Sequence, residues 1–201
     1  MAVQTPVQTK PVEVTWPPPQ GRWTYEDYKR LPDDGWRYEV IEGELLMSPA
    51  PSTNHQDISA NLEFAMMNFV REKKLGKVLH APTDVRLGEL ASPVQPDILF
   101  IRQERLNIIK KDWVEGAPDL IVEILSPSNW IDDRRTKYRV YAQAGVREYW
   151  IVDSDKRQIE VFVQRVHGSD YELIGRFGPG EQAASEVLTG FQIGVDEVCP
   201  E

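Results

Sequence analysis

The chain has 201 residues, of which 41% are hydrophobic and 27% are charged, which suits one domain with a buried core. A mean hydropathy of −0.45 without a long apolar run excludes a membrane-spanning helix, and a single cysteine, Cys199, excludes an internal disulfide and a cysteine-based zinc site. The net charge of −9 argues against a protein that holds nucleic acid by bulk electrostatics, because such domains are usually basic. With no secretory leader visible, we expect a cytoplasmic protein that does not bind membranes.

The beginning of the chain is rich in proline and poor in apolar anchors. Residues 1–21 include the run Pro17-Pro18-Pro19 and predict a flexible arm outside the core. The sequence that follows contains no repeat and no low-complexity stretch. We therefore expect a single domain over residues 22–201.

Two local signals open this domain. Thr24, with Asp27 three residues later, predicts the N-cap of a short helix over residues 24–28. Farther along, apolar and β-branched residues on both sides of a Glu-Gly pair predict a β-hairpin over residues 37–47, with Gly43 in its turn.

The strongest helical pattern in the chain comes next. Thr53 and Gln56 have the spacing of a capping box, and Gly76 is expected to end the helix. The residues that keep helical spacing between these signals are Ile58, Leu62, Ala65, Met66 and Phe69.

The remaining sequence predicts mainly strands. A second helix is expected over residues 131–142, with Gly145 as its stop. The order of hairpin, helix, strands, helix and strands predicts an α/β fold in which helices pack on a mixed sheet. The predicted strands cover residues 77–80, 83–87, 94–101, 119–125, 147–152, 158–163 and 171–174.

Two acidic residues stand in strongly apolar strands. Glu123 lies between Val122 and Ile124, and Asp97 directly precedes the apolar run 98–101. An ionised carboxylate in a strand covered on both faces costs on the order of several kcal/mol unless it is paired or bound to a metal. We expect Asp97 and Glu123 to lie side by side on adjacent strands.

Two interpretations of this acid pair remain open at this point. A hard cation such as Mg²⁺ is the usual partner of converging carboxylates, and it polarises phosphates and lowers the pKa of bound water. Alternatively, each acid forms a structural ion pair with an arginine or meets water at a strand end. The presence of two such acids favours the first interpretation.

An ordered set of motifs around these acids resembles the Uma-two family of restriction endonucleases, a branch of the PD-(D/E)xK nuclease superfamily. The resemblance extends from about residue 25 to residue 163. The motifs are Val94-Gln95-Pro96-Asp97, Pro118-Asp119-Leu120-Ile121-Val122-Glu123-Ile124-Leu125-Ser126-Pro127-Ser128, Lys137, and Gly145-Val146-Arg147-Glu148-Tyr149-Trp150.

The resemblance implies a restriction-endonuclease-like core with an added N-terminal hairpin and C-terminal strands. It also implies hydrolysis of DNA phosphodiester bonds that depends on Mg²⁺, with Mn²⁺ as a substitute. Asp97 and Glu123 match the metal-binding acids. The superfamily places its lysine two residues after the second acid, where this chain has Leu125, and Lys137 on the following helix matches in its place. The residues alone also allow Lys137 to belong to a solvated, charged helix face.

Three further residues are accessory candidates, and two of them, His55 and Glu44, also match the family pattern. His55 is expected near the buried side of its helix, either lining the site or acting as a cap. Glu44, in the hairpin, is either a water-mediated metal ligand or an exposed acid. Asp84 is either a third acid near the cation or a partner of Arg86.

Contacts to DNA would have to come from local positive charge, and cleavage of both strands would need two sites, which suggests a homodimer. Two other functions remain open: a binding or regulatory protein that no longer cleaves DNA, and a metal-dependent phosphoesterase with another substrate. The candidate phosphate-binding residues are expected just beyond the metal site: Arg102, Arg105, Lys110 and Lys111 after the Asp97 strand, and Arg134, Arg135 and Arg139 after the Glu123 strand.

Overall fold

A mixed six-stranded sheet organises the protein, for which a computed structural model describes residues 16–125 and 132–200. The strands follow the spatial order β10-β9-β8-β7-β5-β3, and β7 and β8 are the parallel neighbours within it. This architecture confirms the predicted mixed α/β fold. The strands are β3 (Gly76–His80), β5 (Ile98–Arg102), β7 (Leu120–Leu125), β8 (Glu148–Asp153), β9 (Gln158–Val163) and β10 (Glu172–Phe177).

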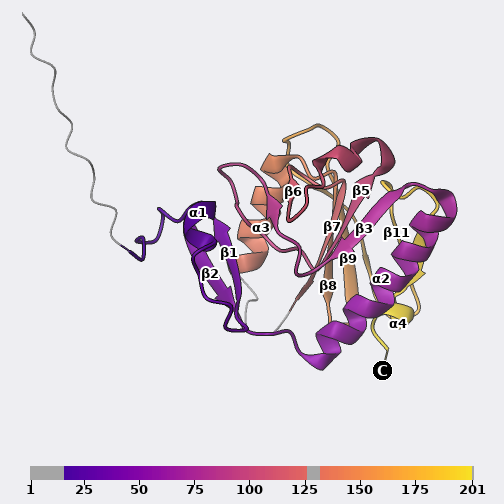
Figure 1. The fold of residues 1–201 in the computed structure, drawn as a ribbon. Helices are drawn as coiled ribbons and strands as arrows, with labels where there is room; N and C mark the ends of the chain where they lie inside the picture. The colour runs from indigo at the N-terminus through magenta and orange to yellow at the C-terminus, as the bar shows by residue number, and fades with distance from the viewer. Residues whose placement is uncertain (1–15, 126–131, 201) are drawn as a thin grey trace, which may run out of the picture.

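Helices cover both faces of this sheet. The long helix α2 (Thr53–Lys73) packs on one face and α3 (Asp132–Ala144) on the other (Figure 1). Side chains alternate along β7, so Val122 joins the α2 side of the core while Ile121 joins the α3 side. Because both faces are covered, Glu123 in the same strand is buried.

The structure corrects both predicted ends of the long helix. Ser52, rather than Thr53, is the N-cap, and its hydroxyl accepts a hydrogen bond from the His55 backbone N–H. At the other end, Lys74 adopts a left-handed conformation with φ 53° and closes the helix before Gly76. Gly76 instead begins β3, where a Cβ atom would clash with the carbonyl oxygen of Ile101 on the neighbouring strand.

The predicted N-terminal elements are confirmed. Helix α1 (Tyr25–Tyr28) begins with a capping box formed by Thr24 and Asp27. The hairpin of β1 (Arg37–Ile41) and β2 (Glu44–Ser48) turns through two residues of positive φ, which suits a type I′ turn. The Val40 N–H donates to the carbonyl of Pro93, and this bond fixes the hairpin beside the sheet, near α3 (Figure 1).

The end of the predicted arm contacts the hairpin region. Residues 1–15 lie outside the described part of the chain, whereas residues 16–21 are described. Trp16 packs edge-on against Trp23 with ring centroids 5.7 Å apart, and the Gln20 side chain hydrogen-bonds to the Leu45 backbone. This part of the arm therefore lies against the domain.

Several short elements complete the fold. The predicted strand 83–87 shrinks to a two-residue strand, and the predicted strand 94–101 becomes regular only at Ile98. Among the described helices, none is long and apolar enough to cross a membrane. The short elements are β4 (Val85–Arg86), the 3-10 helix η1 (Gln103–Ile108), β6 (Val114–Glu115), β11 (Gln182–Ala184), β12 (Gln192–Gly194) and α4 (Val195–Val198).

Candidate functional site

The two acids selected from the sequence meet at one end of β5 and β7. These strands are antiparallel, and Ile98 pairs with Val122, so Asp97 and Glu123 occupy the next positions along the pair. The backbone N–H of Ile124 donates to Asp97 Oδ2 at 2.8 Å. The expectation that the acids lie side by side is thus met.

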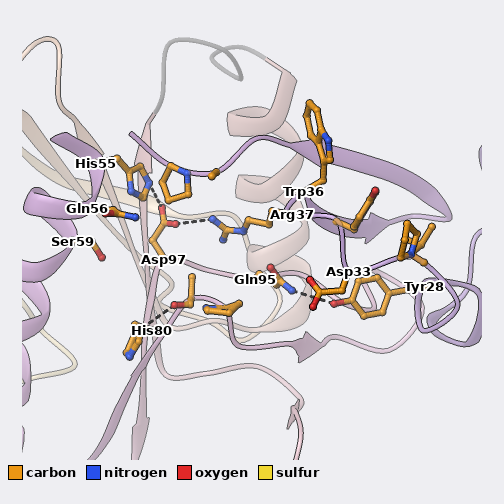
Figure 2. Close-up of a pocket in the computed structure, with 18 of the residues that line it drawn as sticks. Tyr28, Asp33, Trp36, Arg37, His55, Gln56, Ser59, His80, Gln95 and Asp97 are labelled. Atoms are coloured by element: carbon orange, nitrogen blue, oxygen red, sulfur yellow. Dashed lines mark hydrogen bonds and ion pairs between the residues drawn. The ribbon is translucent and has the colours of Figure 1, made fainter. Parts of the chain in front are cut away.

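Asp97 is buried between two basic side chains. Arg37 Nη1 donates to Asp97 Oδ1 at 3.0 Å, and His55 Nε2 lies 3.2 Å from Asp97 Oδ2 (Figure 2). Burial alone would raise the pKa of Asp97. The His55 hydrogen bond, the Arg37 charge and the Ile124 N–H outweigh it and hold the pKa at about 2. Asp97 is therefore a carboxylate at neutral pH.

Glu123 lies in a different electrostatic environment. The Lys137 ammonium lies 3.3 Å from both of its oxygens, and the Tyr141 hydroxyl donates to Oε1 at 2.6 Å. Burial, together with the negative charges of Asp97 and Glu39, nevertheless raises the pKa of Glu123 to about 8. The site thus holds more acid than its cations fully compensate.

Strand β1 contributes two residues that sequence reasoning did not select. Arg37 and Glu39 are two residues apart in β1, so their side chains lie on the same side of the strand and point to the acid pair. Glu39 pairs with the Lys137 ammonium at 2.9 Å and accepts a hydrogen bond from the Gln95 backbone N–H at 2.7 Å. Glu39 sits in an apolar strand as Glu123 does, so the same signal would have found it. Arg37 carries no comparable local signal.

Lys137 does not belong to a solvated helix face. Its side chain is buried and reaches from α3 to both Glu39 and Glu123. Arg135 and Arg139, on the same helix, are exposed. The structure thus places Lys137 beside the acids, as the resemblance implied.

The accessory candidates separate in space. His55 lies in the site, against Asp97. Glu44 is exposed at the turn of the hairpin, four residues along the strand pair from Arg37, or about 13 Å at the usual strand rise. Asp84 belongs to another cluster, where it accepts hydrogen bonds from the Tyr28 hydroxyl at 3.0 Å and the Gln95 amide at 2.9 Å.

The placement predicted for the first group of phosphate-binding residues is wrong. Arg102 and Arg105 follow β5, which runs away from Asp97, so they lie at the opposite end of the strand pair. There, Arg105 Nη1 pairs with the buried Asp119 at 2.8 Å, and the Arg102 backbone N–H donates to the same carboxylate. Lys110 and Lys111 continue the same segment on the exposed surface.

The structure describes the second group of candidate phosphate-binding residues, those after the Glu123 strand, only in part. Arg134 lies in α3, but its side chain falls outside the described residues, and Arg135 is exposed. Arg139 forms a bidentate ion pair with Glu42 of the hairpin turn, which neutralises its charge. Of the candidate phosphate-binding arginines, Arg102 and Arg105 are thus paired with Asp119 and Arg139 with Glu42.

A cavity of about 760 Å³ opens beside Asp97. It lies between the N-terminal part of α2, which contributes His55 and Gln56, and the start of the hairpin, which contributes Trp36 and Arg37 (Figure 2). Glu123 and Lys137 are not part of its lining. The site thus has an accessible side at Asp97 and a closed side at Glu123.

The acid pair fits a divalent cation in its chemistry. Carboxylate oxygens are the ligands that Mg²⁺ prefers, and Mg²⁺ commonly uses only one or two carboxylates together with water and substrate phosphate. Among the described side chains, those of residues 16–125 and 135–200, no three histidine, cysteine or acidic side chains are grouped to hold a metal. Asp97 and Glu123 match the sparser arrangement of two carboxyl groups on adjacent strands.

Comparisons with known proteins identify the fold and the family of this chain. The crystal structure of "a putative nuclease belonging to DUF820" from Anabaena variabilis ATCC 29413 is similar to this chain, with a TM-score of 0.69 and 19% identity over 88% of this chain and 97% of that chain. At this identity the similarity shows the shared fold. Among curated proteins, none matches the chain. The model of the Uma2 (Uma-two) family, described as "Putative restriction endonuclease", matches residues 25–196, and the chain therefore belongs to that family.

Proposed function

We propose that this protein is a divalent-metal-dependent nuclease that hydrolyses phosphodiester bonds of DNA. The observation that carries the proposal is the meeting of Asp97 and Glu123 across β5 and β7, with Lys137 reaching Glu123 from α3. Family membership supports the reaction class.

Asp97 and Glu123 are the residues that would hold Mg²⁺ or Mn²⁺, with the main-chain carbonyl of Ile124 as an expected third ligand. When bound there, the cation supplies Lewis-acid chemistry: it lowers the pKa of a bound water and stabilises negative charge on phosphoryl oxygens.

The chain's own residues prepare the site in three ways. Arg37 and His55 keep Asp97 ionised and fix its orientation. Glu39 holds the Lys137 ammonium next to Glu123, so its positive charge lies beside the acid that would hold the cation. Burial of Glu123 lowers the effective dielectric constant around these charges and strengthens their effect.

The test is cleavage of supercoiled plasmid by the purified protein in Mg²⁺ or Mn²⁺, with Asp97→Asn and Glu123→Gln beside the wild type. We expect nicking or linearisation that requires the metal and is lost in both variants. Glu44→Gln is the matched control, because Glu44 is an exposed acid of the same domain, and it should retain full activity.

Each alternative function has its own outcome in this assay. Activity that survives in Asp97→Asn or Glu123→Gln would contradict the proposed site. Cleavage of a small phosphodiester but not of DNA would favour a phosphoesterase with another substrate. A folded wild type that binds metal through both acids and cleaves neither substrate would favour a binding or regulatory protein.

A further inference from the structure

The cavity beside Asp97 has unused hydrogen-bond donors in its wall. The Nε and Nη2 atoms of Arg37 and the Nδ1 atom of His55 are buried and have no hydrogen-bond partner among the described residues. Leaving such groups unpaired costs free energy, so buried donors normally face a ligand or ordered water. Both residues line the cavity. The two Arg37 atoms are guanidinium donors, which suit an anionic group such as a phosphate, whereas His55 Nδ1 is the acceptor nitrogen of a ring whose Nε2–H donates to Asp97.

The cavity lining also includes aromatic and apolar side chains. Tyr28, Trp36 and Tyr38 contribute to it, together with Pro32 and Pro82. Of these, Trp36 leaves 48% of its surface exposed, a large fraction for a tryptophan. Trp36, the chain neighbour of Arg37, therefore offers a planar apolar group an exposed surface for stacking.

Trp36 also differs from the other described tryptophans in its contacts. Trp16 and Trp23 pack against each other, Trp113 packs against Tyr25, and Trp150 packs against a phenylalanine. Among the described residues, no aromatic or cationic side chain contacts the Trp36 ring. Its indole is thus not used for packing in the way that these other rings are.

The charges around the site disfavour a base-paired substrate. Arg102 and Arg105 lie at the far end of the strand pair with Asp119, and Arg139 is neutralised by Glu42. The net charge of the whole chain, −9, disfavours any nucleic acid held by bulk electrostatics, whether duplex or single-stranded, so binding has to come from local contacts such as base stacking. In a duplex, moreover, the faces of each base are covered by its neighbours and are not open to an aromatic side chain.

We propose that this cavity receives one unpaired nucleotide of the substrate strand, with its base against Trp36 and its phosphate at Arg37. The preferred substrate is then single-stranded DNA. This inference rests on the proposed nuclease function for its biological meaning, but it concerns binding. It can therefore be tested apart from cleavage.

The experiment measures binding of a fluorescein-labelled oligothymidylate about twelve nucleotides long, a length typical of single-strand sites. The same strand annealed to its complement is the duplex probe, and Ca²⁺ replaces Mg²⁺. We expect the wild type to bind the single strand at least about tenfold more tightly than the duplex. Trp36→Ala should weaken single-strand binding about tenfold, because stacking of one base contributes on that scale, and Trp36→Phe should restore most of it.

A second readout separates stacking from a structural role. Binding of unlabelled oligothymidylate should quench part of the tryptophan fluorescence of the wild type, and Trp36→Phe should lose that quenching while it still binds. Equal affinity for duplex and single strand, tighter binding of the matching oligouridylate, or unchanged binding by Trp36→Ala would each overturn the proposal.

The two proposals fail in distinguishable ways. Single-strand binding that depends on Trp36, without any cleavage, would leave the cavity assignment standing and remove the nuclease. Metal-dependent cleavage of duplex DNA that Trp36→Ala does not affect would leave the nuclease standing and remove the cavity assignment.

Discussion

The β5–β7 strand pair carries a buried acid–base cluster at each end, and the two clusters differ in their balance of charge. At one end, a single carboxylate, Asp119, meets Arg102 and Arg105 and also accepts the Arg102 backbone N–H. At the other end, Asp97 and Glu123 join Glu39, and their positive partners are Arg37, Lys137 and the titratable His55. The first cluster is rich in cations and the second is rich in acid.

This difference separates a structural ion pair from a candidate catalytic site. The arginines on Asp119 are about one-third exposed and can turn toward water, so little strain follows from their pairing. Lys137, in contrast, is buried between two carboxylates, and burial raises the pKa of Glu123 to about 8. A buried acid such as Glu123 that keeps its proton can release it when a divalent cation binds in its place.

The largest expected effect is on stability. Lys137→Met leaves Glu39 and Glu123 buried without their shared cation and should lower the free energy of unfolding by about 3 kcal/mol or more. Arg105→Met, the matched loss of a cation at the other cluster, should cost about 1 kcal/mol, because Arg102 remains on Asp119. Urea denaturation measures both. Adding Glu39→Gln to Lys137→Met should recover stability, and failure of that rescue would show that Lys137 acts by packing instead.

The next effect is on cleavage. Lys137→Met should lower the rate of metal-dependent DNA cleavage about 100-fold, the usual scale for loss of one group that stabilises developing charge. Arg105→Met should change the rate less than twofold, because it lies at the far end of the strand pair. Single-turnover assays on folded variants give both numbers, and equal losses would contradict the comparison between the two ends.

A pH effect on stability follows from Glu123. Its pKa is raised in the folded protein, so between about pH 4.5 and 8 the unfolded chain releases a proton that the folded chain retains. Stability in metal-free buffer should therefore fall as pH rises through this window, with a limiting slope of about 1.4 kcal/mol per pH unit. Glu123→Gln should flatten this fall. Asp97 acts in the opposite direction, and only at lower pH, because its pKa is about 2.

The smallest effect belongs to the surface of α3. Arg139 pairs with Glu42, but both side chains are more than one-third exposed. Arg139→Ala should therefore lower the free energy of unfolding by less than about 1 kcal/mol. A loss as large as that of Lys137→Met in the same urea titration would mean that the hairpin depends on this pair for its docking.

Local patterns were sufficient to predict much of the fold. Short stretches of sequence are enough to predict the capping box at Thr24, the Glu-Gly turn of the hairpin and the apolar strands around Ile98 and Ile121. Strands β11 and β12, three residues each, carry too little pattern to be found. The end of α2 was misplaced because Gly76 serves the close approach of two strands, which sequence spacing does not reveal.

Of the candidate site, too, one part was predictable from the sequence and another was not. Asp97 and Glu123 were visible as acids in apolar strands, and the structure joins them. Asp97 precedes β5 and Arg102 ends it, so the length of the strand carries Arg102 to the end opposite the site, although the two residues are close in sequence. Arg37 reaches Asp97 only through the docking of the hairpin, a contact between distant segments that no local pattern records.

The most direct test of the central claim is calorimetric titration of the metal-free protein with Mn²⁺, without substrate. We predict that the wild type binds Mn²⁺ with release of a proton, that Asp97→Asn and Glu123→Gln lose this binding, and that Asp119→Asn retains it. Binding that survives in both site variants, or that Asp119→Asn removes from a folded protein, would contradict the assignment of the metal to the Asp97 end of the strand pair.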